Sequence, residues 1–273
     1  MEILETKTDI GLVREQNEDV VLAVKHPKDE TVKLLIAADG MGGREHGEIA
    51  SRYVAFSLRK WFINKDLETL FDLDKSEQLL RRYIKSLNSN LIKDFGEDKL
   101  GTTLTLALVS KKETLILNTG DSRAYIYKNK KFIQLTEDDS DVWMYYKFGN
   151  VKKDHLRYFT NNSIISACIG ICPELCTISS VRVKNTYDIL LLLTDGVTDN
   201  LTDRRMRTII RQSSDQMILT NLIQEAVYVD QHLKVPLALK RKYTANYSVP
   251  YNGRDNASGV IYIRKRKQKK NNK

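Results

Sequence analysis

A buried strand that ends in an aspartate followed by glycines constrains this chain more than any other stretch. Residues 33–43 read K-L-L-I-A-A-D-G-M-G-G. The continuous apolar run is typical of a strand buried on both faces. A carboxylate at such a strand end is costly to bury unless a cation or several hydrogen-bond donors meet it. Two interpretations follow, an acidic strand end that holds a metal ion, and an ordinary glycine turn that begins at Asp39.

The rest of the chain gives no reason to divide it into several domains. It has 273 residues, shows no internal repeat and has no linker rich in Pro, Gly or Ser. We therefore predict one domain over residues 1–263. No run of about 18 apolar residues suggests a membrane span, and the first residues lack the pattern of a secretion signal. Cys168, Cys172 and Cys176 do not have a usual zinc spacing, so we predict free thiols and a cytoplasmic location.

The positive charge of the chain is concentrated at its end. The formal net charge is +9, but the last ten residues carry seven cations and no acid, which leaves only +2 for the body. We predict that residues 264–273 form a disordered, solvated tail. The tail could also contact anionic lipid, RNA or an acidic partner. Nucleic-acid binding therefore stays a minor alternative.

Hydrophobic periodicity divides the chain into helical and strand-like segments. A helical period begins at residue 46 and recurs over residues 76–95, near 203–212 and over 215–229. Strand-like runs occupy residues 31–38, much of 102–134, 177–183, 188–193 and the stretch after residue 257. Short turns within residues 102–134 imply antiparallel neighbours. Residues 137–170, called the flap below, and residues 230–254 show no clean period.

Acidic residues recur where apolar strands end or begin. Asp39 and Asp195 each follow a strand and precede a glycine, Asp121 follows another strand, and two further acidic positions precede strands: Asp255, and the pair Glu18 and Asp19. These carboxylates could meet only if the strands assemble side by side, and they would then repel one another unless cations neutralised them. Oxygen ligands without His or Cys favour Mg²⁺ or Mn²⁺. Two such ions could hold a phosphate for in-line attack, and Arg14 could grip its oxygens.

Seven motifs occur in order between about residue 9 and residue 263. They are R-E-Q-N-E-D, A-D-G-M-G-G with G-E-I-A-S after it, G-T-T, G-D-S-R-A-Y, L-T-E-D, T-D-G-V-T-D and D-N-A-S. In this order they resemble the metal-dependent serine/threonine protein phosphatases of the type 2C class, and the bacterial branch is the closer match. The resemblance implies an α+β fold, a four-layer α-β-β-α sandwich in which helix pairs flank two antiparallel sheets.

The resemblance also implies a two-metal centre of Mn²⁺ or Mg²⁺. Asp39 would bridge both ions, and Gly40 would bind one of them through its carbonyl oxygen. Asp195 and Asp255 would hold the second ion.

The remaining site residues would act around these ions. Glu18 and Asp19 would act largely through ordered waters, and Asp121 matches a position linked to a third, weaker metal, although G-D-S is also a good turn sequence. Arg14 would bind the substrate phosphate. The implied reaction is attack by a metal-bridging water on phosphoserine or phosphothreonine, without a phosphoenzyme. The substrates would be proteins phosphorylated by a serine/threonine kinase in a bacterium.

Several positions depart from the family pattern. Met41 stands where many eukaryotic relatives have a His proposed as general acid, Arg44 occupies a position that is often His, and Asp139 replaces another common His. The flap lacks the usual R-A-L-G ending, and residues 230–254 are longer than usual. For the aromatic residues of the flap we predict packing rather than substrate recognition. A catalytically weak, phosphatase-like binding module therefore remains the alternative function.

Overall fold

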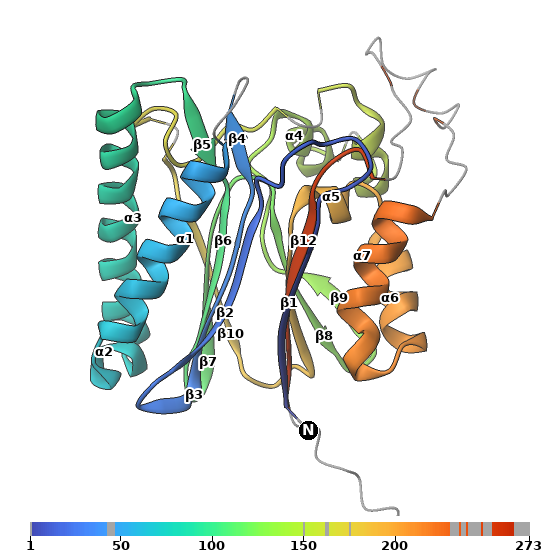
Figure 1. The fold of residues 1–273 in the computed structure, drawn as a ribbon. Helices are drawn as coiled ribbons and strands as arrows, with labels where there is room; N and C mark the ends of the chain where they lie inside the picture. The colour runs from blue at the N-terminus through green and yellow to red at the C-terminus, as the bar shows by residue number, and fades with distance from the viewer. Residues whose placement is uncertain are drawn as a thin grey trace, which may run out of the picture.

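Two antiparallel sheets of five strands each face one another between layers of helices (Figure 1). The computed structural model describes residues 2–42, 47–149, 151–161, 164–174, 176–229, 235, 239, 247 and 253–264. The first sheet contains, in spatial order, β1 (Ile3–Asp9), β12 (Ala257–Ile263), β11 (Ile189–Leu193), β8 (Arg123–Lys128) and β9 (Lys131–Gln134). The second contains β10 (Ser179–Lys184), β7 (Glu113–Thr119), β6 (Leu104–Val109), β3 (Asp29–Ala38) and β2 (Val20–His26). This arrangement confirms the predicted α+β sandwich.

Helices cover the outer face of each sheet. The second sheet is covered by α1 (Gly47–Asn64), α2 (Leu67–Phe71) and α3 (Leu73–Phe95), on the left of Figure 1. The first sheet is covered by α5 (Asp195–Thr198), α6 (Asp203–Gln212), the short 3₁₀ helix η2 (Asp215–Met217) and α7 (Ile218–Tyr228). A small sheet of β4 (Gly40–Gly42) and β5 (Leu100–Thr102) lies at one end of the sandwich.

Side-chain alternation along the strands explains the layers. Successive side chains of a strand point to opposite faces of its sheet. On β3, Leu34 and Ile36 pack against the helices, whereas Leu35 and Ala37 pack against the first sheet. All four are fully buried, so the predicted burial of this strand on both faces is confirmed.

Helix caps explain one boundary that periodicity alone placed wrongly. The helix predicted over residues 76–95 begins three residues earlier, at Leu73, because the Asp72 side chain caps it by accepting from the Lys75 N–H. Periodicity also missed the short α2, whose N-terminus is capped by Asp66 through the Thr69 N–H. A five-residue helix is too short to show a period.

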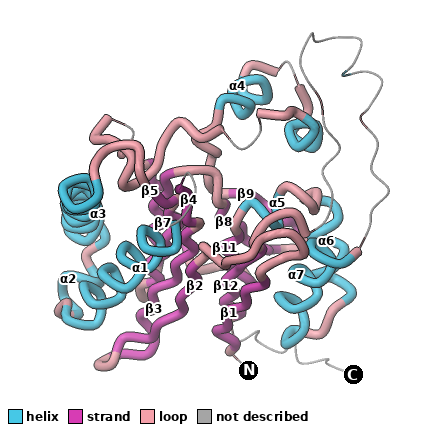
Figure 2. The backbone as a smooth tube through the Cα atoms, turned by 45° about the horizontal axis from the view of Figure 1, so that its top comes forward, coloured by secondary structure: helices cyan, strands magenta, loops and turns pink. Residues whose placement is uncertain are grey.

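The flap is more regular than its sequence suggested. It contains α4 (Asp141–Lys147) and the 3₁₀ helix η1 (Lys153–Tyr158), and α4 stands clear of the sheets beyond the strand ends (Figure 2). Trp143, Tyr158 and Phe159 are buried in a small core of the flap, which includes Leu239. Tyr145 stacks on Phe159 with ring centroids 5.4 Å apart, and Tyr146 meets Trp143 edge-on at 5.0 Å, so the predicted packing holds for these two rings although each residue is 40% exposed. Phe148 is 71% exposed, and the prediction is wrong for it.

Some predictions fall on parts of the chain that are not described. Of residues 230–254, Val235, Leu239, Tyr247, Gly253 and Arg254 are described, and the first three lie against or within the flap core. Arg44 and residues 265–273 of the basic tail also lie outside the described residues. Within the described ranges, no helix is long and apolar enough to cross a membrane.

The layer between the first sheet and α7 gives a test of the packing. Leu191 of β11 is fully buried there. We expect Leu191→Ala to lower the free energy of unfolding by about 3 kcal/mol, because it removes buried methyl groups and leaves a cavity. Phe56→Ala on α1, where the ring is exposed, should change it by no more than about 0.5 kcal/mol. Urea unfolding measures both, and equal losses would contradict the assigned core.

Candidate metal centre

A cavity of about 210 Å³ gathers most of the predicted site residues at one end of the sandwich. Its walls come from the β1–β2 loop, the end of β3, the β7–β8 turn, the start of α5 and the start of β12. The lining residues are Arg14, Glu18, Asp39, Gly40, Met41, Gly42, Thr103, Asp121, Ile165, Asp195 and Asp255. Asp19 does not line this cavity. It is buried behind it, where its carboxylate accepts a hydrogen bond of 2.9 Å from the Thr194 hydroxyl.

The backbone of Asp39 is held by the two threonines of the G-T-T motif. Its N–H donates to the Thr103 hydroxyl at 3.0 Å, and its carbonyl accepts from the Thr102 hydroxyl at 2.9 Å. The Thr103 N–H donates to the same carbonyl at 2.9 Å. These bonds fix the peptide without using the carboxylate, which is left to face the cavity and its acidic neighbours.

Close backbone approach explains two of the glycines. A Cβ on Gly40 would lie 2.3 Å from the Gly47 carbonyl oxygen, and one on Gly196 would lie 2.0 Å from the Asn256 carbonyl oxygen. Real side chains do not tolerate such distances. The glycines that follow Asp39 and Asp195 therefore let α1 and β12 approach the two acidic strand ends.

Asn256 ties the N-terminal loop to the last strand. Its side-chain oxygen accepts from the Glu18 N–H at 2.9 Å, and its amide donates to the carbonyls of Ile10 and Gln16 at 2.9 and 3.0 Å. Sequence reasoning assigned no role to Asn256, although it stands in the D-N-A-S motif. Glu18 is held further by the Gly47 N–H, which donates to its carboxylate at 3.1 Å.

Arg14 reaches the site from the same loop. Its guanidinium donates to the Asp255 carboxylate at 2.8 Å and lies 3.9 Å from that of Glu18. The Arg14 side chain is 46% exposed, so solvent reaches it. The structure thus brings Arg14 to the mouth of the acidic cavity.

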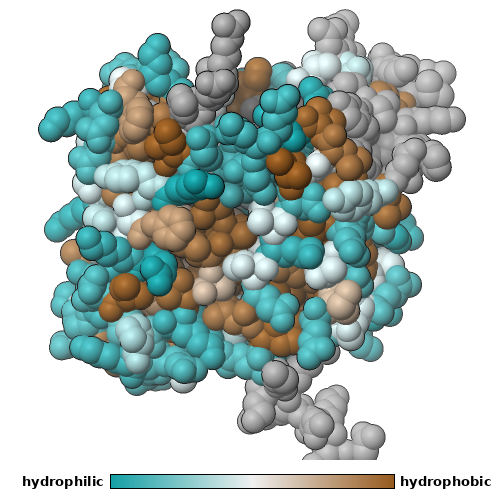
Figure 3. Space-filling model, viewed as in Figure 1, coloured by the Kyte–Doolittle hydropathy of each residue, from teal (hydrophilic) through white to brown (hydrophobic). Residues whose placement is uncertain are grey.

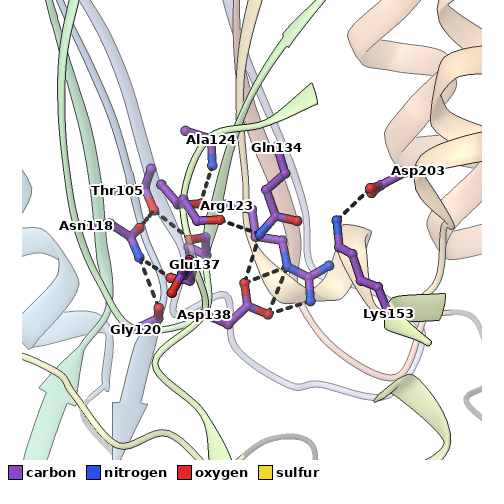
Figure 4. A network of polar contacts seen from close by, with 12 residues as sticks. Thr105, Asn118, Gly120, Arg123, Ala124, Gln134, Glu137, Asp138, Lys153 and Asp203 are labelled. Carbon is purple, nitrogen blue, oxygen red and sulfur yellow. Dashed lines mark hydrogen bonds and ion pairs between the residues drawn. The ribbon is translucent and has the colours of Figure 1, made fainter. Parts of the chain in front are cut away.

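Asp139, which replaces a common His of the family pattern, holds the turn that carries Asp121. The Gly120 N–H donates to the Asp139 carboxylate at 2.9 Å, and the Asp139 N–H donates to the Gly120 carbonyl at 3.0 Å. Asn118 donates to the same carbonyl (Figure 4). Asp139 therefore supports this turn through hydrogen bonds to its backbone.

A buried ion pair lies behind this turn. Arg123 donates to both carboxylate oxygens of Asp138 at 2.6–3.0 Å (Figure 4). Lys153 of η1 pairs with Asp203 of α6 at 2.6 Å nearby, which joins the flap to the helical layer. Both Arg123 and Asp138 are buried, so the loss of either partner would leave an uncompensated charge.

Burial and mutual repulsion dominate the electrostatics of the cavity. Burial raises the pKa of Asp39 and Asp195 well above the usual range, and neighbouring carboxylates raise both further. Burial also raises the pKa of Asp19 and of Asp121 to about 7. Among the charges that act on Asp39 are those of Asp19, Asp195, Asp255 and Asp121, so the acidic strand ends do converge.

The cavity offers carboxylate oxygens, which are the ligand atoms that hard divalent cations prefer. Within the described part of the chain, one oxygen each of Asp19 and Asp195 is buried and has no hydrogen-bond partner. Anionic oxygens without donors are what a cation would satisfy. Among the described residues, no three acidic, His or Cys side chains form a cluster that could hold an ion by themselves, and the Asp255 carboxylate is bonded to Arg14 instead.

Comparisons with known proteins identify the family. The family model of protein phosphatase 2C matches residues 14–235. The serine/threonine phosphatase Stp of Listeria welshimeri is 29% identical over 211 residues, which are 76% of this chain and 82% of the relative. The protein phosphatase PhpP of Streptococcus pneumoniae is 27% identical over 207 residues, 74% of this chain and 82% of the relative.

Solved structures agree with this result. The phosphatase Stp1 of Staphylococcus aureus has a TM-score of 0.79 at 27% identity, covering 97% of this chain and 96% of its own. The catalytic domain of PstP, in complex with two manganese ions, shares the fold with a TM-score of 0.72 at 22% identity.

The chain belongs to the protein phosphatase 2C family. The predicted family is confirmed, and with it the activity of a metal-dependent protein serine/threonine phosphatase. The alternative of a catalytically weak binding module is not favoured.

The raised pKa values predict how stability depends on pH when divalent cations are removed. The cavity carboxylates bind protons more tightly in the folded than in the unfolded protein, so stability falls as the pH rises from about 4 to about 7. Asp121→Asn should reduce this loss by up to about 4 kcal/mol, because it removes a buried carboxylate whose pKa is raised from 3.8 to about 7. Thermal unfolding in EDTA at several pH values measures the slope. Asp94→Asn on the exposed surface of α3 should leave the slope unchanged, and a slope equally steep in the Asp121 variant would show that the buried Asp121 carboxylate does not cause it.

Proposed function

We propose that the cavity is a two-metal catalytic centre for Mn²⁺ or Mg²⁺. Asp39 would contact both ions, Gly40 would bind through its carbonyl oxygen, and Asp195 and Asp255 would complete the second site. The observation that carries this proposal is the convergence of four acidic strand ends on one cavity, with a partnerless buried oxygen on Asp195. Family membership supports the use of divalent cations.

Three further acidic residues would act around these ions. Glu18 lines the cavity, and Asp19 lies behind it with one oxygen left unsatisfied by hydrogen bonds in the described structure. We assign both to contacts through ordered waters. Asp121 lines the cavity from the β7–β8 turn, and we assign it to a third, weaker ion.

The proposed reaction is hydrolysis of phosphoserine and phosphothreonine in proteins phosphorylated by a serine/threonine kinase. When bound, the ions would neutralise phosphate charge and make a water molecule a better nucleophile. Arg14 would turn from Asp255 to the substrate, since its planar guanidinium matches two phosphate oxygens. Met41 lines the cavity without a proton to donate, so the leaving group takes its proton from another source.

The nearby serine supports a mechanism without a phosphoenzyme. Ser122 follows Asp121, and its hydroxyl is buried and hydrogen-bonded to the Thr103 hydroxyl at 2.9 Å. A nucleophilic serine needs access to substrate and an adjacent base. Ser122 has neither in the described structure, which favours attack by water.

The location and the domain limits stay proposals. Cys168, Cys172 and Cys176 are free, and burial raises the pKa of the Cys168 thiol to about 12. Free thiols accord with a reducing, cytoplasmic compartment. We also keep residues 1–263 as one domain and residues 264–273 as a separate solvated tail, with contact to acidic partners or anionic surfaces as the alternative.

The metal proposal predicts loss of activity when a ligand is changed. Hydrolysis of a phosphothreonine peptide should require Mn²⁺ and stop in EDTA. Asp39→Asn and Asp195→Asn should each lower kcat/KM by at least about 100-fold, because they remove a negative ligand while keeping the shape. Removal of residues 267–273 should have no effect. Metal-dependent turnover at wild-type rates in both Asn variants would refute the assignment.

The role of Arg14 gives a separate prediction. Arg14→Ala should raise KM for the phosphopeptide about tenfold or more, because it removes a charged contact to the phosphate. Arg59→Ala, at an exposed position on α1, is the matched control and should leave KM unchanged. Steady-state kinetics at saturating Mn²⁺ measure both. If Arg14→Ala and Arg59→Ala gave the same KM, phosphate binding by Arg14 would be excluded.

A further inference from the structure

An exposed apolar surface adjoins the mouth of the cavity. It combines residues of the β1–β2 loop with the C-terminal end of α7 and its next residue. Its members are between 39% and 61% exposed, and they are Ile10, Leu12, Val13, Tyr228 and Val229. We call this surface the apolar rim. In Figure 3, apolar side chains appear in the upper part of the face, above the position of β12 in Figure 1.

Specific contacts build the apolar rim from segments that are distant in sequence. The Leu12 N–H donates to the Gly253 carbonyl at 2.6 Å, and the Tyr228 hydroxyl donates to the Asp9 carboxylate at 3.0 Å. Gly253 has a positive φ of 73°, and a Cβ there would lie 2.6 Å from the Leu12 side chain. The loop is thus fixed against the start of β12 and the end of α7 while its apolar side chains still face solvent.

The apolar rim is continuous with the catalytic cavity. Val13 directly precedes Arg14, whose guanidinium is bonded to the cavity residue Asp255. Asn256 holds the loop on both sides of these residues, at the carbonyls of Ile10 and Gln16. An extended peptide advances about 3.3 Å per residue. A side chain two to four positions from a phosphorylated residue held by Arg14 therefore reaches the rim.

Exposed apolar surface of this kind usually marks an interaction site. We propose that the apolar rim binds bulky apolar side chains two to four residues from the phosphorylated residue of a protein substrate. The inference rests on the proposed function, because it takes Arg14 as the phosphate contact. A polypeptide substrate is the occupant that the position favours, since any chain whose phosphate enters the cavity must leave past its mouth. The rim would then select substrates by their flanking sequence.

The test compares peptides that differ only in flanking residues. Phosphothreonine peptides would carry Leu or Phe two to four positions before or after the phosphothreonine, and matched peptides would carry Ala there. We expect the wild type to prefer one apolar series by about tenfold in kcat/KM, because burying one such side chain has this effect. The double variant Leu12→Ser, Val13→Ser should lose the preference. Val229→Ser should reduce it from the α7 side, because it removes an apolar side chain of the rim and keeps the Tyr228–Asp9 bond that fixes the loop.

Matched controls separate the rim from the catalytic centre. Phe56→Ser removes a ring that is 50% exposed on α1 and should keep the preference. p-Nitrophenyl phosphate has no flanking residues, so its kcat/KM should change far less than that of the apolar peptides. No preference in the wild type, or the same preference in the rim variants, would overturn the inference.

Two further results would separate substrate binding at the rim from a dimer contact and from failure of the catalytic centre. If the rim instead joined two copies of the chain, the double variant would change the sedimentation of the protein and leave the peptide preference intact, which would overturn the inference. If the wild type failed to hydrolyse p-nitrophenyl phosphate with Mn²⁺, the proposed catalytic centre would fail by itself. The rim would then be judged by fluorescence polarisation of the same labelled phosphopeptides, where equal affinity for the two series would reject it.

Discussion

The repulsion among carboxylates gathered at one end of the sandwich is the constraint around which this structure is arranged. Asp39, Asp195, Asp121 and Asp255 face one cavity, and burial adds to the cost of their charge. At Asp39 and Asp121, hydrogen bonds to the neighbouring peptide groups keep the carboxylates in place, whereas the Asp255 carboxylate is itself bonded to Arg14. Thr102 and Thr103 hold the backbone of Asp39, and Asp139 holds the turn of Asp121. The fold thus concentrates negative charge that only cations or protons can relieve.

The use of hydrogen bonds to the backbone explains why the chain tolerates Asp139, which departs from the family pattern. Asp139 stands in place of a common His, yet its carboxylate binds the Gly120 N–H and so supports the turn directly. Burial raises the pKa of Asp139 to about 6. Asp139 therefore acts on the candidate metal centre through the backbone of the turn that carries Asp121. Another side chain with a hydrogen-bond acceptor can hold this turn in the same way.

Much of the architecture could be predicted from the sequence, because helices and strands that pack against a core carry apolar residues at regular intervals. The last five residues before Asp39, residues 34–38, are all apolar and are buried on both faces of the sheet, and the helix ending at Phe95 shows a clear apolar stripe. The ordered motifs located every acidic residue now found around the cavity. The contacts of Asn256 could not be predicted, because they depend on the distance between two loops that are far apart in sequence. The exposure of Tyr145 and Phe148 could not be predicted either, because the sequence alone does not distinguish an aromatic side chain that is buried from one that lies on the surface.

The pairing of β1 with β12 has a consequence for synthesis of the protein. These strands are the first and last of those that the structure describes, and they lie side by side with Ile3 opposite Ile263. The bond between Arg14 and Asp255 spans 241 positions of the chain. Contacts of such long range form late, because closing the long loop between the two residues lowers the entropy of the chain before the contact adds any stability. A nascent chain therefore holds the phosphate-binding loop without its partner until β12 has been synthesised, and a product truncated before β12 has no assembled catalytic end.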